Sequence, residues 1–201
     1  MANITVFTSN GSGVVSSVDS GWGGTQTLIQ SQTITNGALM EFTSGIDSTY
    51  QEYMFEFLNV HPVTNNNINF EWQANASGQS GYNERMDSTF FVAQLRNNNS
   101  SAALQYDASG DRANETTYQP MALGIGNLLK ESGSGELHIF NPASTTYTKQ
   151  WYGKMHIYHA SDYSINNYSA GYINTTAAIT QISFQFNTGN FSGTIKMYGI
   201  Q

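Results

Sequence analysis

Three pairs of carboxylates lie close enough along the chain to suggest the acid and the base of a glycosidase. The pairs are Asp107 with Asp111, Asp47 with Glu52, and Glu131 with Glu136. Glycoside hydrolysis needs two carboxyl groups that face each other across roughly 5–9 Å. Nothing in the local pattern places any pair in that way, and acidic side chains are ordinarily solvated at a protein surface. We therefore expect no catalytic carboxylate.

A partial calcium-binding pattern occurs in the same region. Asp107, Ser109 and Asp111 alternate as oxygen ligands do at the start of a calcium loop. Arg112 then occupies the position where the sharp turn needs glycine, and Tyr118 occupies the position of the bidentate glutamate. A calcium site is thus the less favoured alternative, and we expect neither a metal nor any other cofactor.

The nucleophiles and histidines are also poorly placed for catalysis. The segment Gly189-Asn-Phe-Ser192-Gly193 lacks the spacing of a Gly-x-Ser-x-Gly elbow and reads as a hairpin turn. His156 and His159 are three residues apart, which sends their side chains to opposite faces of a strand. His138 lies inside an expected strand, where a neighbour or water satisfies it. None of the four histidines is expected to be catalytic.

Tyrosines are concentrated between residues 145 and 175, in a chain in which 13% of the residues are aromatic. They are Tyr147, Tyr152, Tyr158, Tyr163, Tyr168 and Tyr172. Each ring offers an apolar face and a polar tip, which suits both stacking against sugars and burial in a subunit interface. The alternative is that most of them are outward-facing sheet residues of high β propensity.

The elements that must position these residues are short segments in which apolar and polar residues alternate. Ile182, Phe184 and Phe186 point to one face, with polar residues between them, which is typical of a half-buried antiparallel strand. Similar patterns predict strands at Tyr50–Val60, Ile68–Ala74, Ser88–Leu95, Glu136–Phe140, Trp151–Tyr163 and Gly193–Gln201. The last of these is expected to lie within a sheet. No segment shows a sustained 3.6-residue period, so we expect little helix.

Two connections are predicted from turn residues and composition. The strands at 50–60 and 68–74 are expected to pair as a hairpin, because Pro62 and the asparagines after it suit a turn. Arg96–Gln119 is expected to be a long polar loop, a feature that is often functional or interface-forming. Met121–Leu129 is either a strand or one short helix.

The first part of the chain differs from the rest in composition. Ser9–Gly24 is rich in glycine and serine and contains Trp22. Such a segment cannot form its own core, so we expect a flexible arm at residues 1–24 and a single β domain at residues 25–201. Trp22 either caps the core of that domain or belongs to an arm that docks on a neighbouring subunit.

Length and charge limit the possible partners. The 201 residues suffice for one β domain with a sizeable core. The net charge is −7 and the seven lysines and arginines stand singly, which argues against nucleic-acid binding. There is no cysteine, hence no disulfide or thiolate metal site. We expect no membrane insertion and no signal peptide, because no long apolar run is present.

Five runs of residues carry a resemblance to a known family. They are Phe42–Tyr50, Phe57–Pro62, His138–Ser144, Ala170–Ala177 and Gly193–Gly199, within a similarity that spans roughly Leu28 to Ile200. In these runs the chain resembles a family of virion structural proteins from tailed bacteriophages, especially marine and cyanobacterial ones. Its members are described as tail-fibre, decoration or structural proteins. The resemblance implies a place in the virion and a β-sandwich, and no motif in it marks a chemistry.

These observations favour an all-β protein, an antiparallel β-sandwich of jelly-roll type. We expect a non-enzymatic virion component, a capsid decoration or fibre/knob subunit, made in the cytoplasm of the bacterial host. Its expected partners are other virion proteins of the capsid or tail and further copies of itself, in a homotrimer. One alternative is a receptor-binding head that holds host surface glycan through Tyr and Asn loops. A second alternative is a small glycan hydrolase.

Overall fold

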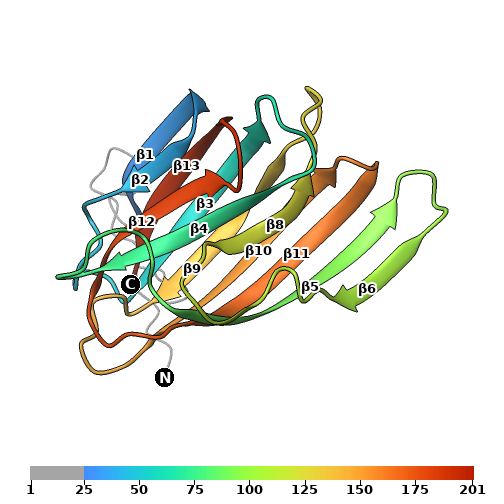
Figure 1. Cartoon of the computed structure of the whole chain (residues 1–201). Helices are drawn as coiled ribbons and strands as arrows, with labels where there is room; N and C mark the ends of the chain where they lie inside the picture. Colours follow the sequence, from blue (N-terminus) through green and yellow to red (C-terminus); the bar gives the residue numbers. More distant parts are fainter. Residues whose placement is uncertain (1–24) are drawn as a thin grey trace, which may run out of the picture.

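The computed structural model describes residues 25–201, and these residues form thirteen β-strands with no helix between them. Every pairing between strands is antiparallel, as Figure 1 shows for the long strands of the larger sheet. The expected low helix content is confirmed in this part of the chain. No helix that could span a membrane occurs among these residues. Residues 1–24, with the predicted arm and Trp22, lie outside the described part.

The strands form two layers. The large sheet has the order β1 (Gln26–Gly37), β13 (Phe191–Ile200), β3 (Glu52–Pro62), β9 (Gly133–Phe140), β10 (Lys149–His159), β11 (Tyr163–Ile173) and β5 (Met86–Arg96), with β6 (Ala102–Tyr106) and β7 (Arg112–Glu115) both paired to β5. The small sheet has the order β2 (Leu39–Phe42), β12 (Ile179–Phe186), β4 (Ile68–Ala76) and β8 (Gln119–Ile125).

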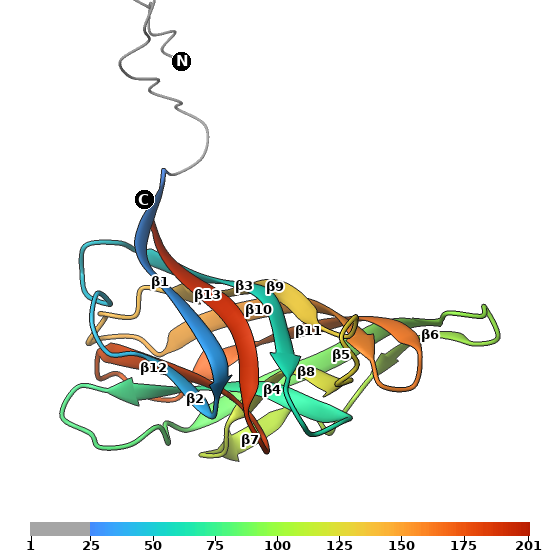
Figure 2. The same ribbon diagram turned by 90° about the horizontal axis from the view of Figure 1, so that it is seen from above.

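The two sheets pack face to face as a sandwich. Figure 2 separates β12, β2 and β4 from β3, β9 and β10. The layers are joined by several connections of the chain, such as the direct passage from β1 to β2, and by one bridge between His159 of β10 and Ile125 of β8. The antiparallel β-sandwich is therefore confirmed, while the jelly-roll topology stays a prediction.

Alternating burial explains why these segments are strands. In β10 the odd-numbered residues from Trp151 to Ile157 are buried and the even-numbered residues between them are exposed. The last strand follows the same rule, with Ile195 and Met197 buried. It lies between β1 and β3, so the prediction that the final segment belongs to a sheet is confirmed.

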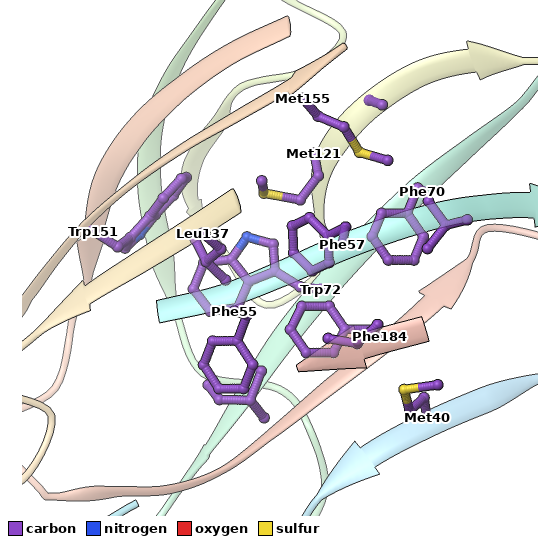
Figure 3. Packing of buried hydrophobic residues seen from close by; sticks show 14 of the residues in the cluster. Met40, Phe55, Phe57, Phe70, Trp72, Met121, Leu137, Trp151, Met155 and Phe184 are labelled. Carbon is purple, nitrogen blue, oxygen red and sulfur yellow. The ribbon is translucent and has the colours of Figure 1, made fainter. Parts of the chain in front are cut away.

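Aromatic rings from both sheets meet in the core, as Figure 3 shows. Phe184 of β12 lies edge-on to Phe57 of β3, with ring centroids 5.2 Å apart. Trp72 of β4 meets Trp151 of β10 at 5.1 Å, again edge-to-face. Edge-to-face pairs add to the stabilisation that burial of the rings already gives. The inward faces predicted for these strands are confirmed by this packing.

The predicted hairpin between the strands at 50–60 and 68–74 is wrong. β3 pairs with β13 and β9, whereas β4 pairs with β12 and β8. The turn after Pro62 carries the chain from one sheet to the other, and Phe57 faces Phe70 across the core with centroids 5.3 Å apart. The segment Gly189–Gly193, which reads as a hairpin turn, likewise differs: Phe191, Ser192 and Gly193 already belong to β13, and residues 187–190 connect β12 in the small sheet with β13 in the large sheet.

The prediction that Arg96–Gln119 is one long polar loop is also wrong. It contains β6 and β7, and β8 begins at its last residue. Five residues of β6 pair with β5 in regular register, from Leu95 opposite Ala102 to Phe91 opposite Tyr106. The segment Met121–Leu129 is expected from its sequence to be either a strand or one short helix. The strand is confirmed, because β8 covers residues Gln119–Ile125.

Candidate functional site

The members of the three candidate carboxylate pairs are bound to different partners. Asp107 accepts hydrogen bonds from the backbone N–H (3.1 Å) and the hydroxyl (2.6 Å) of Ser109, so it stabilises its own turn. Asp111 instead accepts a hydrogen bond from Tyr106. Among residues 25–201 no group of three or more His, Cys, Asp or Glu is gathered as metal ligands would be.

The other two pairs are also divided between different tasks. Asp47 accepts hydrogen bonds from the N–H of Thr49 (2.8 Å) and the hydroxyl of Tyr53 (3.0 Å), and the bonds to Thr49 chiefly hold its pKa below the ordinary value. Glu131 is buried and accepts a hydrogen bond from the N–H of Leu128 at 2.8 Å. Glu52 and Glu136, the second members of these two candidate pairs, lie instead beside His138 on the large sheet.

Three of the four histidines have ordinary structural contacts. His61 Nδ1 contacts the carbonyl of Glu131, and His156 Nε2 lies 2.9 Å from the hydroxyl of Ser164. His159 Nδ1 accepts a hydrogen bond from the N–H of Ser161 (3.0 Å), and burial lowers the pKa of its imidazole. The fourth, His138, has a different environment.

His138 lies on the outer face of the large sheet but is only 7% exposed. Its Nδ1 contacts the Glu52 carboxylate, and Tyr152 stacks on its ring with centroids 4.5 Å apart. Its Nε2 has no hydrogen-bond partner, and the closest carboxylate oxygen, Oε2 of Glu136, is 3.7 Å away. A buried polar atom without a partner is unusual and is directed here toward a surface carboxylate.

A row of four charges crosses the outer face next to His138. The register of β13, β3, β9 and β10 places Lys196, Glu56, Glu136 and Lys154 side by side. Glu56 accepts hydrogen bonds from Lys196 and Tyr198, both at 3.2 Å, and chiefly the hydrogen bond to this carboxylate raises the pKa of Lys196. Two like charges directly opposite each other destabilise a sheet, and Lys196 and Lys154 on the two outer sides offset part of the repulsion between Glu56 and Glu136.

A shallow depression of about 400 Å³ adjoins this row. Its lining includes Glu56, Glu136, Lys154, His156, Ser134 and Asn166. The small side chain of Ser134 faces His156, and His156 faces Asn166, on the neighbouring strands β9, β10 and β11. The depression therefore runs across the strands, bordered on one side by the row of charges.

The far end of the same face is apolar. Phe91 and Leu95 of β5 and Leu104 and Tyr106 of β6 are all exposed, Leu104 at 74%. The ring of Tyr168 on β11 stacks on Phe91 with centroids 4.9 Å apart, which extends the apolar surface toward the centre of the sheet. We call these five residues the β5–β6 patch. They lie at the end of the molecule opposite β1 (Figure 1).

The predicted tyrosines divide between this face and the loops. Tyr152 covers His138 and Tyr168 belongs to the β5–β6 patch. Tyr147 is exposed in the connection before β10, and Tyr158 donates a hydrogen bond to Asp162 at 2.9 Å. Tyr163 lies beneath the guanidinium of Arg96, and the hydrogen bond to Asp87 raises the pKa of Tyr172.

Sequence reasoning did not find the Glu56–Glu136 pair or the β5–β6 patch. The two glutamates are outward residues of separate strands, and only the register of β3 with β9 makes them neighbours. The patch had a weak signal, since Leu104 and Tyr106 alternate with polar residues inside a segment taken for a loop. Comparisons with protein-family models, curated proteins and solved structures found no match for the chain.

Proposed function

We propose that this chain is a non-enzymatic structural subunit of a tailed-bacteriophage particle, a capsid decoration or fibre/knob protein that acts by assembling with copies of itself. The observation that carries the proposal is the β5–β6 patch. Contiguous exposed apolar surface of this kind marks sites of protein association, and aromatic residues are enriched in such interfaces. The other partners in the proposal are the capsid or tail proteins of the virion.

The location of the patch supports this role. β6 pairs only with β5 among residues 25–201, so its outer edge leaves backbone donors and acceptors unpaired. An apolar strand at the edge of a sheet readily pairs with another chain unless it is protected. A second copy that covers the patch would remove Leu104 and Tyr106 from water and could satisfy that edge.

The order of the strands also supports the proposal. Eight of them form two groups of four, β1-β13-β3-β9 and β2-β12-β4-β8. In chain order these strands alternate between the layers except at β4 and β8, which both lie in the small sheet, and this is the order that we infer for two interlocked Greek keys, a jelly roll. Viral capsid domains use this fold, although a fold alone does not determine a function.

We propose a trimer as the oligomeric state. A closed three-fold ring needs a heterologous interface, in which two different surfaces of neighbouring subunits meet. The large sheet has two different edges, β1 at one end and β6 with β7 at the other. Contact between unlike edges of successive copies would satisfy this requirement, whereas like edges would give a two-fold dimer.

The non-enzymatic role is supported by how the Glu56–Glu136 pair is held. Glu56 is bonded to Lys196 at 3.2 Å, and Glu136 lies opposite Lys154. Glycoside hydrolysis needs one of two carboxylic acids to be protonated as the general acid. Such an acid is typically kept in an apolar pocket, whereas 36% and 46% of the side-chain surfaces of Glu56 and Glu136 are exposed, which suits hydrogen-bond acceptors better than an acid catalyst.

Light scattering on the purified chain tests the proposal. We expect a mass three times that of one chain, and a monomer after Leu104→Asp, because a charge would be buried without a partner in the interface. Leu129→Asp is the matched control, since Leu129 is fully exposed (102%) and lies outside the patch. A wild-type monomer at all concentrations, or an oligomer that Leu104→Asp leaves intact, would contradict the proposal. Immunogold labelling of purified phage particles tests the virion location separately.

A further inference from the structure

We infer that the depression beside the Glu56–Glu136 pair is a binding site for a neutral oligosaccharide. Its lining provides hydrogen-bond acceptors in Glu56 and Glu136 and donors in Lys154, with Ser134 and Asn166 able to act as both. The two cations and two anions of the adjoining row cancel in charge. Such a lining matches an uncharged ligand with many hydroxyl groups.

The positions of the two glutamates point to a ligand. Their side chains are directly opposite on neighbouring strands, and 36% and 46% of their side-chain surfaces are exposed. Lys196 and Lys154 offset part of the repulsion between them, and hydroxyl groups that donate to both carboxylates would relieve the remainder. Hydrogen bonds to ionised acceptors are roughly twice as strong as those between neutral groups.

A second and independent observation is the unpartnered Nε2 of His138. This atom is buried beneath Tyr152 and lies 3.7 Å from Oε2 of Glu136. Because Nδ1 is engaged by Glu52, the ring is fixed and directs Nε2 toward the Glu136 side of the site. His138 therefore lies beside the site, next to Glu136, and does not itself line the depression.

Other ligand classes fit less well. The row of charges has no net charge to attract a phosphate group, and a metal ion would compete with the flanking lysines Lys154 and Lys196 for the two carboxylates. An extended peptide binds best at a sheet edge through its backbone. Along this part of the face the strands β3, β9, β10 and β11 are already paired on both sides.

The experiment is a glycan array with the intact chain, followed by calorimetric titration of the best neutral oligosaccharide. Glu136→Gln and Lys154→Met keep the size of each side chain and remove its charge, and each should weaken binding by about tenfold. Glu115→Gln is the matched control, since Glu115 is an exposed carboxylate of β7, and it should leave the affinity unchanged.

Three outcomes would overturn the inference. They are an array on which no neutral oligosaccharide binds, an affinity that both variants leave within about twofold of wild type, and binding of Ca²⁺ alone that Glu136→Gln abolishes. Light scattering on the same samples shows whether each variant keeps its oligomeric state. A failure of the self-association proposal is thereby separated from a failure of this site.

Discussion

Glu71 of β4 predicts an unusual dependence of stability on pH. Glu71 is only 9% exposed, and burial raises the pKa of its carboxyl from an ordinary value of 4.5 to about 7. The nearby charge of Arg112 and a hydrogen bond with Gln185 act in the opposite direction but are smaller. Between these two pH values the native protein keeps a proton that the unfolded chain has released. The contribution of Glu71 to stability is therefore greatest below pH 4.5, falls as pH rises to about 7, and stays low above it.

The size of the effect follows from the shift. One pKa unit corresponds to about 1.4 kcal/mol, so a shift from 4.5 to about 7 corresponds to at most about 3.5 kcal/mol of unfolding free energy. Glu71→Gln has nearly the same shape and cannot ionise. We expect Glu71→Gln to be more stable than wild type at about pH 9 by roughly 2–3 kcal/mol and similar to it at about pH 4.

Urea unfolding of both proteins across this pH range measures the difference. Groups that titrate equally in both proteins cancel when the two free energies are subtracted at each pH, which isolates Glu71. A difference that stays constant with pH would refute the reasoning. If the unfolding free energy of the wild type instead increased relative to that of Glu71→Gln as pH rises, the attraction between Glu71 and Arg112 would outweigh the cost of burial.

Two further variants test the packing and the buried polar contacts. Phe184→Ala should lower the unfolding free energy in urea by about 3–5 kcal/mol, because its ring packs on Phe55 and Phe57 in the core; the exposed control Tyr147→Ala should change it by less than about 0.5 kcal/mol. Lys149→Met should cost about 2–3 kcal/mol, since the ammonium of this buried residue donates to the carbonyls of Tyr147 (3.0 Å) and Thr175 (3.2 Å). A thermal or urea transition unchanged by Lys149→Met would mean that water replaces these bonds.

The sequence predicts which face of a strand is buried better than it predicts which strand is its neighbour. The alternation in β12 correctly identifies Phe184 as a core residue, because burial depends on a period of two that local residues determine. The partner of β3 depends on where the chain goes after Pro62, and a turn of that composition serves a hairpin or a crossing between sheets equally well. The hairpin prediction failed for this reason.

The same limit explains why β6 and the site were missed. β6 is mostly exposed on both faces, so the weak alternation of Leu104 and Tyr106 with polar residues does not correspond to a buried face that would identify it as a strand. Glu56 and Glu136 are eighty residues apart in the chain, and their approach depends on the register of β3 with β9. The predicted pairs were close in sequence, but on a sheet the neighbours of a side chain come mainly from other strands.

Burial also indicates which surface of the sandwich is available for function. The outward residues of β4 that sequence alternation predicts to be solvated are covered, and Gln73 donates to the carbonyls of Glu84, Thr116 and Thr117 at 3.1–3.2 Å. The chain itself thus closes part of the outer face of the small sheet. On the large sheet, Tyr152, Lys154 and His156 remain exposed. A partner or ligand therefore has access to the large sheet, whose outer face carries both the depression and the β5–β6 patch.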